Sequence, residues 1–142
     1  MKVAYNACFG GFGLSPLAEN EYRKKKGIDL FWYHGVGGYP YQSYEKIKDL
    51  SGIKEIGFAL KVSTKDLGDL VSEIPNEHFF YESWYDRENR NDPDLIEIIE
   101  RLGEKANGFF AKLAIKEIPD GVDFEITEYD GFEDVVPPRT TW

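Results

Sequence analysis

The chain has 142 residues, of which 42% are hydrophobic and 15% aromatic, a composition typical of a globular protein. Its formal net charge is −9, from 26 acidic and 17 basic residues, which argues against DNA or RNA as a partner but allows a small anionic ligand held by local arginines. One cysteine excludes an internal disulfide, and the sequence has neither an apolar run of about 18 residues nor a signal-peptide pattern. We therefore expect a single domain, residues 1–142, that is soluble, cytoplasmic and not bound to a membrane.

The first elements of the chain have clear start and stop signals. Residues 1–7 alternate apolar and polar side chains, which predicts a strand. Ser15 is a good N-cap, Pro16 suits the first helical position, and Gly27 is a natural stop. These signals predict a helix over residues 16–26.

The middle of the chain has weaker signals. In chain order we expect a short strand at 28–33, a loop rich in Gly, Tyr and Pro at 35–44, an amphipathic segment from about Ser43, a strand around 58–62, a segment at 64–70 able to open a helix, and an aromatic strand at 78–84.

The clearest helix comes late in the chain. Asp92 is expected to cap it, and Pro93 takes its first position. An apolar stripe at helical spacing follows, formed by Leu95, Ile99 and Leu102. We expect this helix over residues 93–103.

Three strands are expected after this helix, at residues 110–118, 122–129 and 132–136. Asp130-Gly131, between the last two, is a strong two-residue hairpin signal. The order of the elements predicts an α+β fold, with a mostly antiparallel sheet and two to three helices.

The most informative segment is the glycine-rich stretch at residues 8–16. Glycine permits a positive φ and close backbone approach, and a helix N-terminus offers unpaired N–H groups to an anion. The candidates for binding a flat, nucleotide-like ligand here are Phe9, Gly10, Gly11, Phe12 and Ser15. A plain strand-to-helix turn, whose two phenylalanines fill the core, explains the segment equally well.

A second group of candidate binding residues precedes the last helix. Aromatic rings can stack on a purine, amides can read its edge, and arginine can bind phosphate. The candidates are Phe79, Tyr81, Asn89, Arg90 and Asn91, joined by Arg139 and Thr140 near the C-terminus. Arg90 and Arg139 are the phosphate candidates because the sequence gives neither a structural role. The simpler alternative is that alternate aromatics face the core and that Asn91-Asp92 only caps the helix.

Catalytic and metal sites have less support. His34 and His78 are the only histidines, and neither stands at a ligand spacing from the other or from Cys8. A lone cysteine beside two phenylalanines is more often a small buried hydrophobe than a nucleophile. No phosphate-binding P-loop motif follows the glycines. We expect no catalytic residue, no metal and no cofactor, although hydrolysis stays open because carboxylates are plentiful.

Several short segments carry a resemblance to known proteins. They are Cys-Phe-Gly-Gly-Phe-Gly-Leu-Ser (8–15), Asn-Asp-Pro-Asp-Leu-Ile-Glu (91–97), Glu-Lys-Ala-Asn-Gly (104–108), Ala-Lys-Leu (111–113), Glu-Ile-Pro-Asp (117–120), Glu-Tyr-Asp-Gly (128–131) and Arg-Thr-Thr-Trp (139–142). These segments resemble a group of small bacteriophage proteins that includes the Thoeris anti-defence 1 family. The match covers both ends and much of the C-terminal half, but not residues 28–75.

The resemblance implies a function. Thoeris anti-defence 1 proteins are sponges, not enzymes: they bind and hold the cyclic ADP-ribose-type signal made by bacterial TIR-domain immune proteins, and some also hold cyclic oligonucleotides. It implies an oligomer built from dimers in the cytoplasm of an infected host cell, with ligand sites at subunit interfaces.

The resemblance also implies roles for particular residues. An aromatic before the last helix would stack on adenine and an asparagine about ten residues later would bond to it, a spacing kept by Tyr81 with Asn91 and by Phe79 with Asn89. The family often carries arginine after Ala-Asn-Gly, where this chain has Phe109. That departure argues against a phosphate contact there and against cyclic oligonucleotides as ligands.

Together these observations predict a phage anti-defence protein that sequesters a nucleotide immune signal without cleaving it. The alternatives are a nucleotide-signal hydrolase or other small phage enzyme, and a protein-binding inhibitor of a host factor. The chain has 22 aromatic residues (10 Phe, 9 Tyr and 3 Trp). A single small core is not expected to bury them all, and exposed aromatic patches often contact a partner. We therefore also expect a homodimer or an assembly of dimers.

Overall fold

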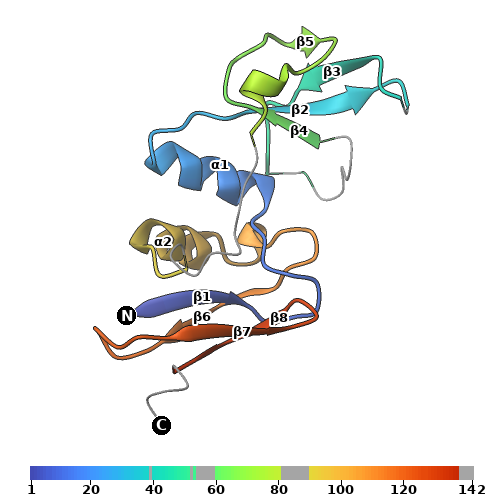
Figure 1. Cartoon of the computed structure of the whole chain (residues 1–142). Helices are drawn as coiled ribbons and strands as arrows, with labels where there is room; N and C mark the ends of the chain where they lie inside the picture. The colour runs from blue at the N-terminus through green and yellow to red at the C-terminus, as the bar shows by residue number, and fades with distance from the viewer. Residues whose placement is uncertain (39, 52, 54–59, 81–89, 138–142) are drawn as a thin grey trace. The chain divides into compact units, whose positions relative to one another are not determined.

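The computed structural model describes residues 1–38, 40–51, 53, 60–80 and 90–137 (Figure 1). The chain divides into two compact units, Met1–Tyr22 with Ser83–Trp142 (unit 1) and Arg23–Glu82 (unit 2). The described residues form eight strands, all paired antiparallel, and two α-helices. The α+β class expected from the sequence is therefore confirmed, while the single domain stays a prediction.

Unit 1 holds two pairs of strands and most of the helical structure. Its elements are β1 (Lys2–Asn6), the start of α1 (Pro16–Lys25), α2 (Pro93–Leu102), the 3-10 helix η4 (Gly103–Ala106), β6 (Leu113–Glu117), β7 (Glu125–Tyr129) and β8 (Phe132–Val136). β1 pairs with β6, and β7 pairs with β8. In Figure 1, α2 lies on one side of the β1–β6 pair and the β7–β8 hairpin lies on the other.

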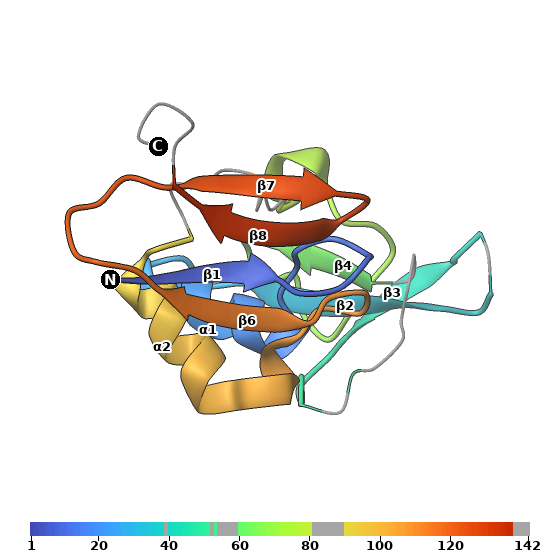
Figure 2. The ribbon, with the colours of Figure 1, turned by 90° about the horizontal axis from the view of Figure 1, so that it is seen from below.

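Both faces of β1 are buried. Ala4 lies on one face, in a cluster with the inward side chains of α1 and α2. Val3 lies on the other face, packed against Phe124 and Val135. Figure 2 shows β1 alongside β6, with the hairpin close by. Strand alternation thus lets a single five-residue strand serve two separate core clusters.

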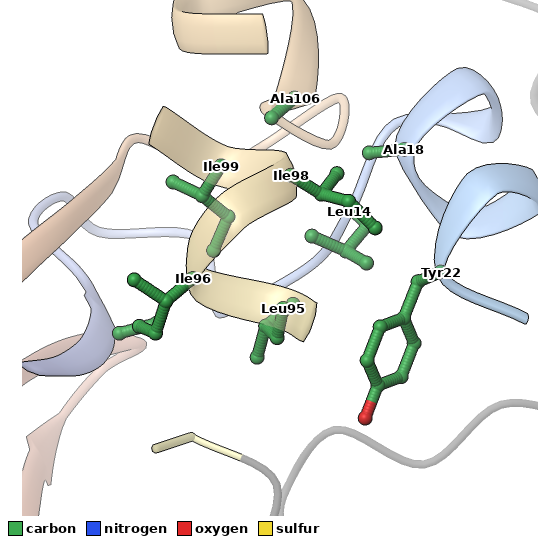
Figure 3. Close-up of a cluster of buried hydrophobic side chains, with 9 residues drawn as sticks. Leu14, Ala18, Tyr22, Leu95, Ile96, Ile98, Ile99 and Ala106 are labelled. Atoms are coloured by element: carbon green, nitrogen blue, oxygen red, sulfur yellow. The ribbon is translucent and has the colours of Figure 1, made fainter. Parts of the chain in front are cut away.

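The two α-helices begin where the sequence predicts. Ser15 Oγ accepts a hydrogen bond from the Ala18 backbone N–H (3.2 Å), and Asp92 Oδ1 accepts one from the Asp94 N–H (3.0 Å). Their apolar side chains meet in one cluster, in which Figure 3 labels Leu14, Ala18, Tyr22, Leu95, Ile96, Ile98, Ile99 and Ala106. The Tyr22 hydroxyl also donates to Asp92 Oδ2 (2.6 Å), so the cap of α2 is tied to α1.

The Asp130-Gly131 turn joins β7 and β8 as the sequence predicts. Both residues have positive φ, 50° and 85°, which suits a type I′ turn. Tyr129 pairs with Phe132 directly across the turn. Their side chains therefore leave the same face of the hairpin, at the end where it turns.

Unit 2 is built on a four-stranded antiparallel sheet in the order β4-β2-β3-β5. Its elements are β2 (Phe31–Val36), β3 (Ser43–Lys46), β4 (Leu60–Ser63), β5 (Leu70–Val71) and the 3-10 helix η2 (Asn76–His78). Tyr33 is fully buried in β2, and its hydroxyl accepts a hydrogen bond from the Leu67 N–H (3.0 Å) and donates one to the Gly68 carbonyl (2.9 Å). The tyrosine thereby fixes the connection between β4 and β5.

The middle of the chain differs from the expectations at three places. The amphipathic segment expected from about Ser43 is a strand, β3, because its backbone pairs with β2 and β5. Residues 64–70 form no helix, because the Asp66 carboxylate accepts from the Gly68 N–H and Gly68 has a φ of 92°. His78 closes η2 and begins no strand, whereas Phe79 bridges Ser63 and the Phe80 N–H donates to the Val62 carbonyl of β4 (3.0 Å). Residues 81–84 of the expected strand, and Phe58, lie outside the described residues.

The cap of α2 gives a first prediction. Asp92→Ala removes the acceptor of the Asp94 N–H and of the Tyr22 hydroxyl, so we expect a loss of about 1–3 kcal/mol in unfolding free energy. The melting temperature should fall by roughly 4–10 °C. Glu104→Ala, at an exposed side chain in η4, is the matched control and should melt with the wild type. An unchanged melting temperature for Asp92→Ala would contradict the role of the cap.

A second prediction concerns pH and unit 2. The Lys46 ammonium donates a hydrogen bond to Asp66 Oδ1 and the Gly68 N–H donates another, which lowers the pKa of the Asp66 carboxyl. A lowered pKa means that the folded state binds this proton less readily than the unfolded state. The stabilisation is therefore present above the ordinary pKa and is lost as the pH falls through the folded value.

Asp66→Asn should destabilise the protein near neutral pH and lose this effect in acid. The measurement is urea unfolding of both proteins at about pH 6 and at about pH 3, around the ordinary carboxyl range. The difference in unfolding free energy should shrink at the lower pH. A difference that stays constant with pH would rule out a contribution from this carboxylate.

Candidate functional site

The glycine-rich loop, residues 7–13, packs its backbone against two other segments of unit 1. A Cβ placed on Gly10 would lie 2.1 Å from the carbonyl oxygen of Phe110. A Cβ on Gly131, in the hairpin turn, would lie 2.5 Å from the backbone nitrogen of Gly11. Real Cβ atoms do not approach so closely, so glycine is needed at both positions. The glycines therefore allow close contact between backbone segments of this chain, where the sequence suggests close contact between backbone and ligand.

Three aromatic rings gather beside this loop and are largely open to solvent. Phe9 is 65% exposed, Tyr129 78% and Phe132 40%. The Phe9 ring centroid lies 5.3 Å from that of Phe132 and 6.5 Å from that of Tyr129, at interplanar angles of 53° and 76°. These distances are typical of interacting aromatic pairs. We call Phe9, Tyr129 and Phe132 the aromatic cluster.

The charge beside the aromatic cluster is acidic. Glu128 and Asp130 flank Tyr129 in the sequence, and the Glu128 carboxylate accepts a hydrogen bond from the Gly131 N–H. Carboxylates repel phosphate and accept hydrogen bonds from hydroxyl and amino groups. The chemistry that this surface offers is stacking on a flat group.

A buried ion pair lies beneath the loop. Arg90 is 1% exposed, and its two terminal nitrogens donate to the two carboxylate oxygens of Glu133, over 2.6 and 2.9 Å. The guanidinium carbon lies 3.8 Å from the centre of the Phe12 ring. The planar guanidinium thus binds a carboxylate and stacks on an aromatic face, two contacts that suit arginine and not lysine.

Asn6 extends this pair toward the loop. Its backbone N–H donates to Glu133 Oε1 (2.9 Å). Its side-chain nitrogen donates to the carbonyls of Cys8 and Gly131 (2.8 Å each), and its side-chain oxygen accepts from the Lys112 N–H (2.8 Å). One buried asparagine therefore joins β1, the loop, the hairpin turn and the approach to β6. Asn6, Glu133 and Arg90 form the buried network.

The structure brings together part of the expected site. Phe9, Gly10, Gly11, Phe12 and Arg90 all lie in or beneath the glycine-rich loop. Ser15 is used as the cap of α1, and its hydroxyl also donates to the Lys105 carbonyl (2.6 Å). Phe79 belongs to unit 2, where the Lys61 ammonium lies 5.3 Å from its ring centre. The candidates Tyr81, Asn89, Arg139 and Thr140 lie outside the described residues.

The expectation that Arg90 lies outside the core is wrong. The sequence shows an arginine with no evident structural role, whereas the structure buries it against Glu133 and Phe12. Both carboxylate oxygens of Glu133 are engaged by its guanidinium, so this face of Arg90 is taken by the protein itself. Its partner Glu133 stands at an inward position of β8, where an alternating pattern expects an apolar residue.

Asn91 lies at a different surface of unit 1, an open hollow of about 840 Å³ along α2. The hollow is lined by Met1, Lys2, Asn91, Pro93, Ile96, Glu97, Glu100 and Arg101. Its charges are paired: Lys2 donates to Glu100 and Arg101 donates to Glu97, each over 2.8 Å. These hydrogen bonds raise the pKa of both basic groups. The Asn91 amide lies 3.6 Å from the Met1 sulfur, so it faces the rim of this hollow and not the aromatic cluster.

Sequence reasoning missed Asn6, Tyr129, Phe132 and Glu133. The only available signal for the two aromatics was their place on either side of Asp130-Gly131, since a two-residue hairpin sets such residues opposite each other. Asn6 ends a strand, and nothing in its local pattern marks it as a hub.

No protein-family model, curated protein or solved structure matches this chain. In the part of the chain that the structure describes, no helix is long and apolar enough to cross a membrane. Within the same residues, no group of three or more His, Cys, Asp or Glu side chains is placed to hold a metal ion. The geometry of unit 1 and the sequence motifs together carry the functional hypothesis.

The loop contacts give a third prediction. Gly131→Ala places a Cβ against the backbone of the glycine-rich loop, whereas Gly121→Ala meets no atom within 4 Å. Both positions have a positive φ, 85° and 75°, so both variants carry the left-handed backbone cost of about 1–2 kcal/mol. Gly131→Ala should add an overpacking cost of about 1–3 kcal/mol.

The measurement is chemical unfolding of the two variants side by side. Gly121→Ala is the control for the backbone conformation alone. Equal losses of unfolding free energy in both variants would show that the loop does not depend on this close approach.

Proposed function

We propose that this chain is a phage anti-defence protein that binds a nucleotide immune signal of the cyclic ADP-ribose type and retains it without cleaving it. The observation that carries the proposal is the aromatic cluster at the glycine-rich loop. Its rings are exposed and close together. The backbone that carries them is closely packed, with Gly10 against Phe110 and Gly131 against Gly11. A nucleobase stacked on such rings gains about 1–3 kcal/mol per contact, and the phosphates of the ligand would face away from the Glu128 and Asp130 carboxylates.

The buried network supports binding because it prepares the surface in advance. A loop that is ordered before the ligand arrives loses less conformational entropy on binding. Asn6 holds the loop at Cys8 and the turn at Gly131, so Phe9 and Tyr129 start from fixed backbone positions. The sequence resemblance to the Thoeris anti-defence 1 family supports the nucleotide as the ligand class.

The surroundings of Cys8 give no support to a cysteine nucleophile. Its sulfur lies 3.5 Å from Asn6 Oδ1 and 3.4 Å from the Phe110 carbonyl oxygen, both of which are acceptors and not general bases. A nucleophilic cysteine requires a base or a cation that favours its thiolate.

An assembly of identical chains is part of the proposal. Phe110 is 77% exposed close to the aromatic cluster, and Phe109 beside it is exposed as well. Exposed apolar side chains in this number are typical of surfaces that meet a partner. We propose a homodimer or an assembly of dimers, which sedimentation at micromolar concentration would detect.

A retention and release experiment tests the function. The protein is incubated with cyclic ADP-ribose, separated from free ligand on a desalting column, and then heated, and the supernatant is analysed by chromatography. A sponge returns intact cyclic ADP-ribose in proportion to the protein. Recovery of a hydrolysed product would make the protein an enzyme, and no retention together with a co-purifying host protein would make it an inhibitor of a host factor.

Substitutions in the aromatic cluster test the site. Phe9→Ala and Tyr129→Ala should each weaken cyclic ADP-ribose binding about 5- to 150-fold, the equivalent of a lost stacking contact of 1–3 kcal/mol. Both side chains are exposed, so the melting temperature should stay within about 2 °C of wild type, as for ordinary surface substitutions. Leu70→Ala, at an equally exposed apolar position in β5, is the control and should bind like wild type. Unchanged binding by both cluster variants would place the ligand elsewhere.

A further inference from the structure

Arg90 and Glu133 reach the glycine-rich loop from two sides. On one side the Arg90 guanidinium lies against the Phe12 ring, near the C-terminal end of the loop. On the other side Glu133 Oε1 accepts from the Asn6 N–H, immediately before the loop begins. Phe9 lies between these two attachments. The ion pair therefore spans the segment that carries the exposed phenylalanine.

The same pair is joined to the other half of the aromatic cluster. Glu133 follows Phe132 in β8 and faces inward where Phe132 faces solvent. The Asn6 side chain, whose backbone Glu133 binds, donates to the Gly131 carbonyl in the turn beside Tyr129. A shift of the pair would thus move the loop ring and the hairpin rings relative to each other.

The stability of the fold does not by itself explain this pair. Burying two charges costs desolvation energy, and replacing a buried ion pair with apolar side chains of similar volume is often neutral or stabilising. The Arg90–Glu133 pair makes two hydrogen bonds, and Glu133 accepts a third from the Asn6 N–H. Hydrogen bonds are directional, so they fix the position of each partner, which apolar contacts do not.

We infer that Arg90 is a positioning residue, which acts through Glu133 and Asn6 to hold the glycine-rich loop and the hairpin turn in the arrangement that presents the aromatic cluster. The contacts above support the positions of the loop and the turn. That these positions serve ligand binding rests on the proposed function. Arg90 need not touch the ligand to affect its binding.

The test uses a double variant that keeps the volume and removes the directional contacts, Arg90→Met with Glu133→Leu. The protein should still fold, but its melting temperature should fall by roughly 3–10 °C, because the leucine leaves the buried Asn6 N–H without its acceptor. Amide hydrogen exchange at Ala7 and Lys112, whose N–H groups donate to the Lys112 carbonyl and to Asn6 Oδ1, should speed up at least about tenfold, since a lost hydrogen-bonded tether opens this end of the loop more often. Exchange in α2, residues 95–101, should not change. Binding of cyclic ADP-ribose should weaken by a similar factor.

The control pair is Lys116→Met with Asp134→Leu. These two side chains join β6 to β8, the strand that also carries Glu133, but the pair is partly exposed and its nitrogen and oxygen lie 3.5 Å apart; Lys116 also donates to the Val135 carbonyl (2.8 Å). We expect wild-type exchange in the loop and wild-type binding. Arg90→Lys keeps the charge but loses the two-point contact and the flat face over Phe12, so it should fall between the wild type and the double variant.

The outcomes separate this inference from the proposed function. Wild-type protein that holds no cyclic ADP-ribose would contradict the function, while the exchange data would still decide the positioning role. Loop exchange equal to wild type in the double variant would overturn the inference. Loss of the fold in both the double variant and Arg90→Lys would also overturn it, because the pair would then be a folding requirement.

Discussion

Strand β1 is covered on both faces, and the arrangement of unit 1 depends on that burial. Lys2, the first residue of β1, reaches solvent, but the buried positions of the strand cannot send a polar side chain to water, so a polar group there must find partners inside the protein. Asn6 is that group, and it is fully buried. Its amide is met by two backbone carbonyls and a backbone N–H, and its own N–H is met by Glu133.

The remaining polar contacts follow from this one requirement. Glu133 is an acid in a buried position and needs a cation, which Arg90 supplies. Arg90 in turn rests its planar group on Phe12, so a side chain from the loop completes the set. Each of these contacts thus provides a partner for a polar or charged group that is already buried. Glu133 accepts from the Asn6 N–H, Arg90 pairs with Glu133, and Phe12 packs on Arg90. The result of these contacts at the surface is the aromatic cluster.

The sequence predicts the elements that local chemistry decides. Ser15, Pro16 and Gly27 mark one helix, Asp92 and Pro93 start the other, and Asp130-Gly131 turns the last hairpin, because each signal acts within a few residues of itself. Ser43 begins a strand for a different reason, since β3 exists through pairing with β2 and β5, and such pairing leaves little trace in four residues. Only part of the candidate site could be predicted, because local signals reveal some of its residues and long-range contacts fix the others. Phe9 and Phe12 stand out locally, whereas the join between Asn6 and Glu133 spans 127 positions of sequence.

In the glycine-rich loop and the hairpin turn, different residues maintain the backbone and form the exposed surface. Gly10 and Gly131 are restricted by the backbone beneath them, while Phe9 and Tyr129 project from that backbone into solvent. A change at either glycine is a change to folding, but a change at either ring is nearly free of folding cost. The exposed rings can therefore be exchanged one at a time without first acquiring stabilising changes elsewhere, whereas the two glycines cannot.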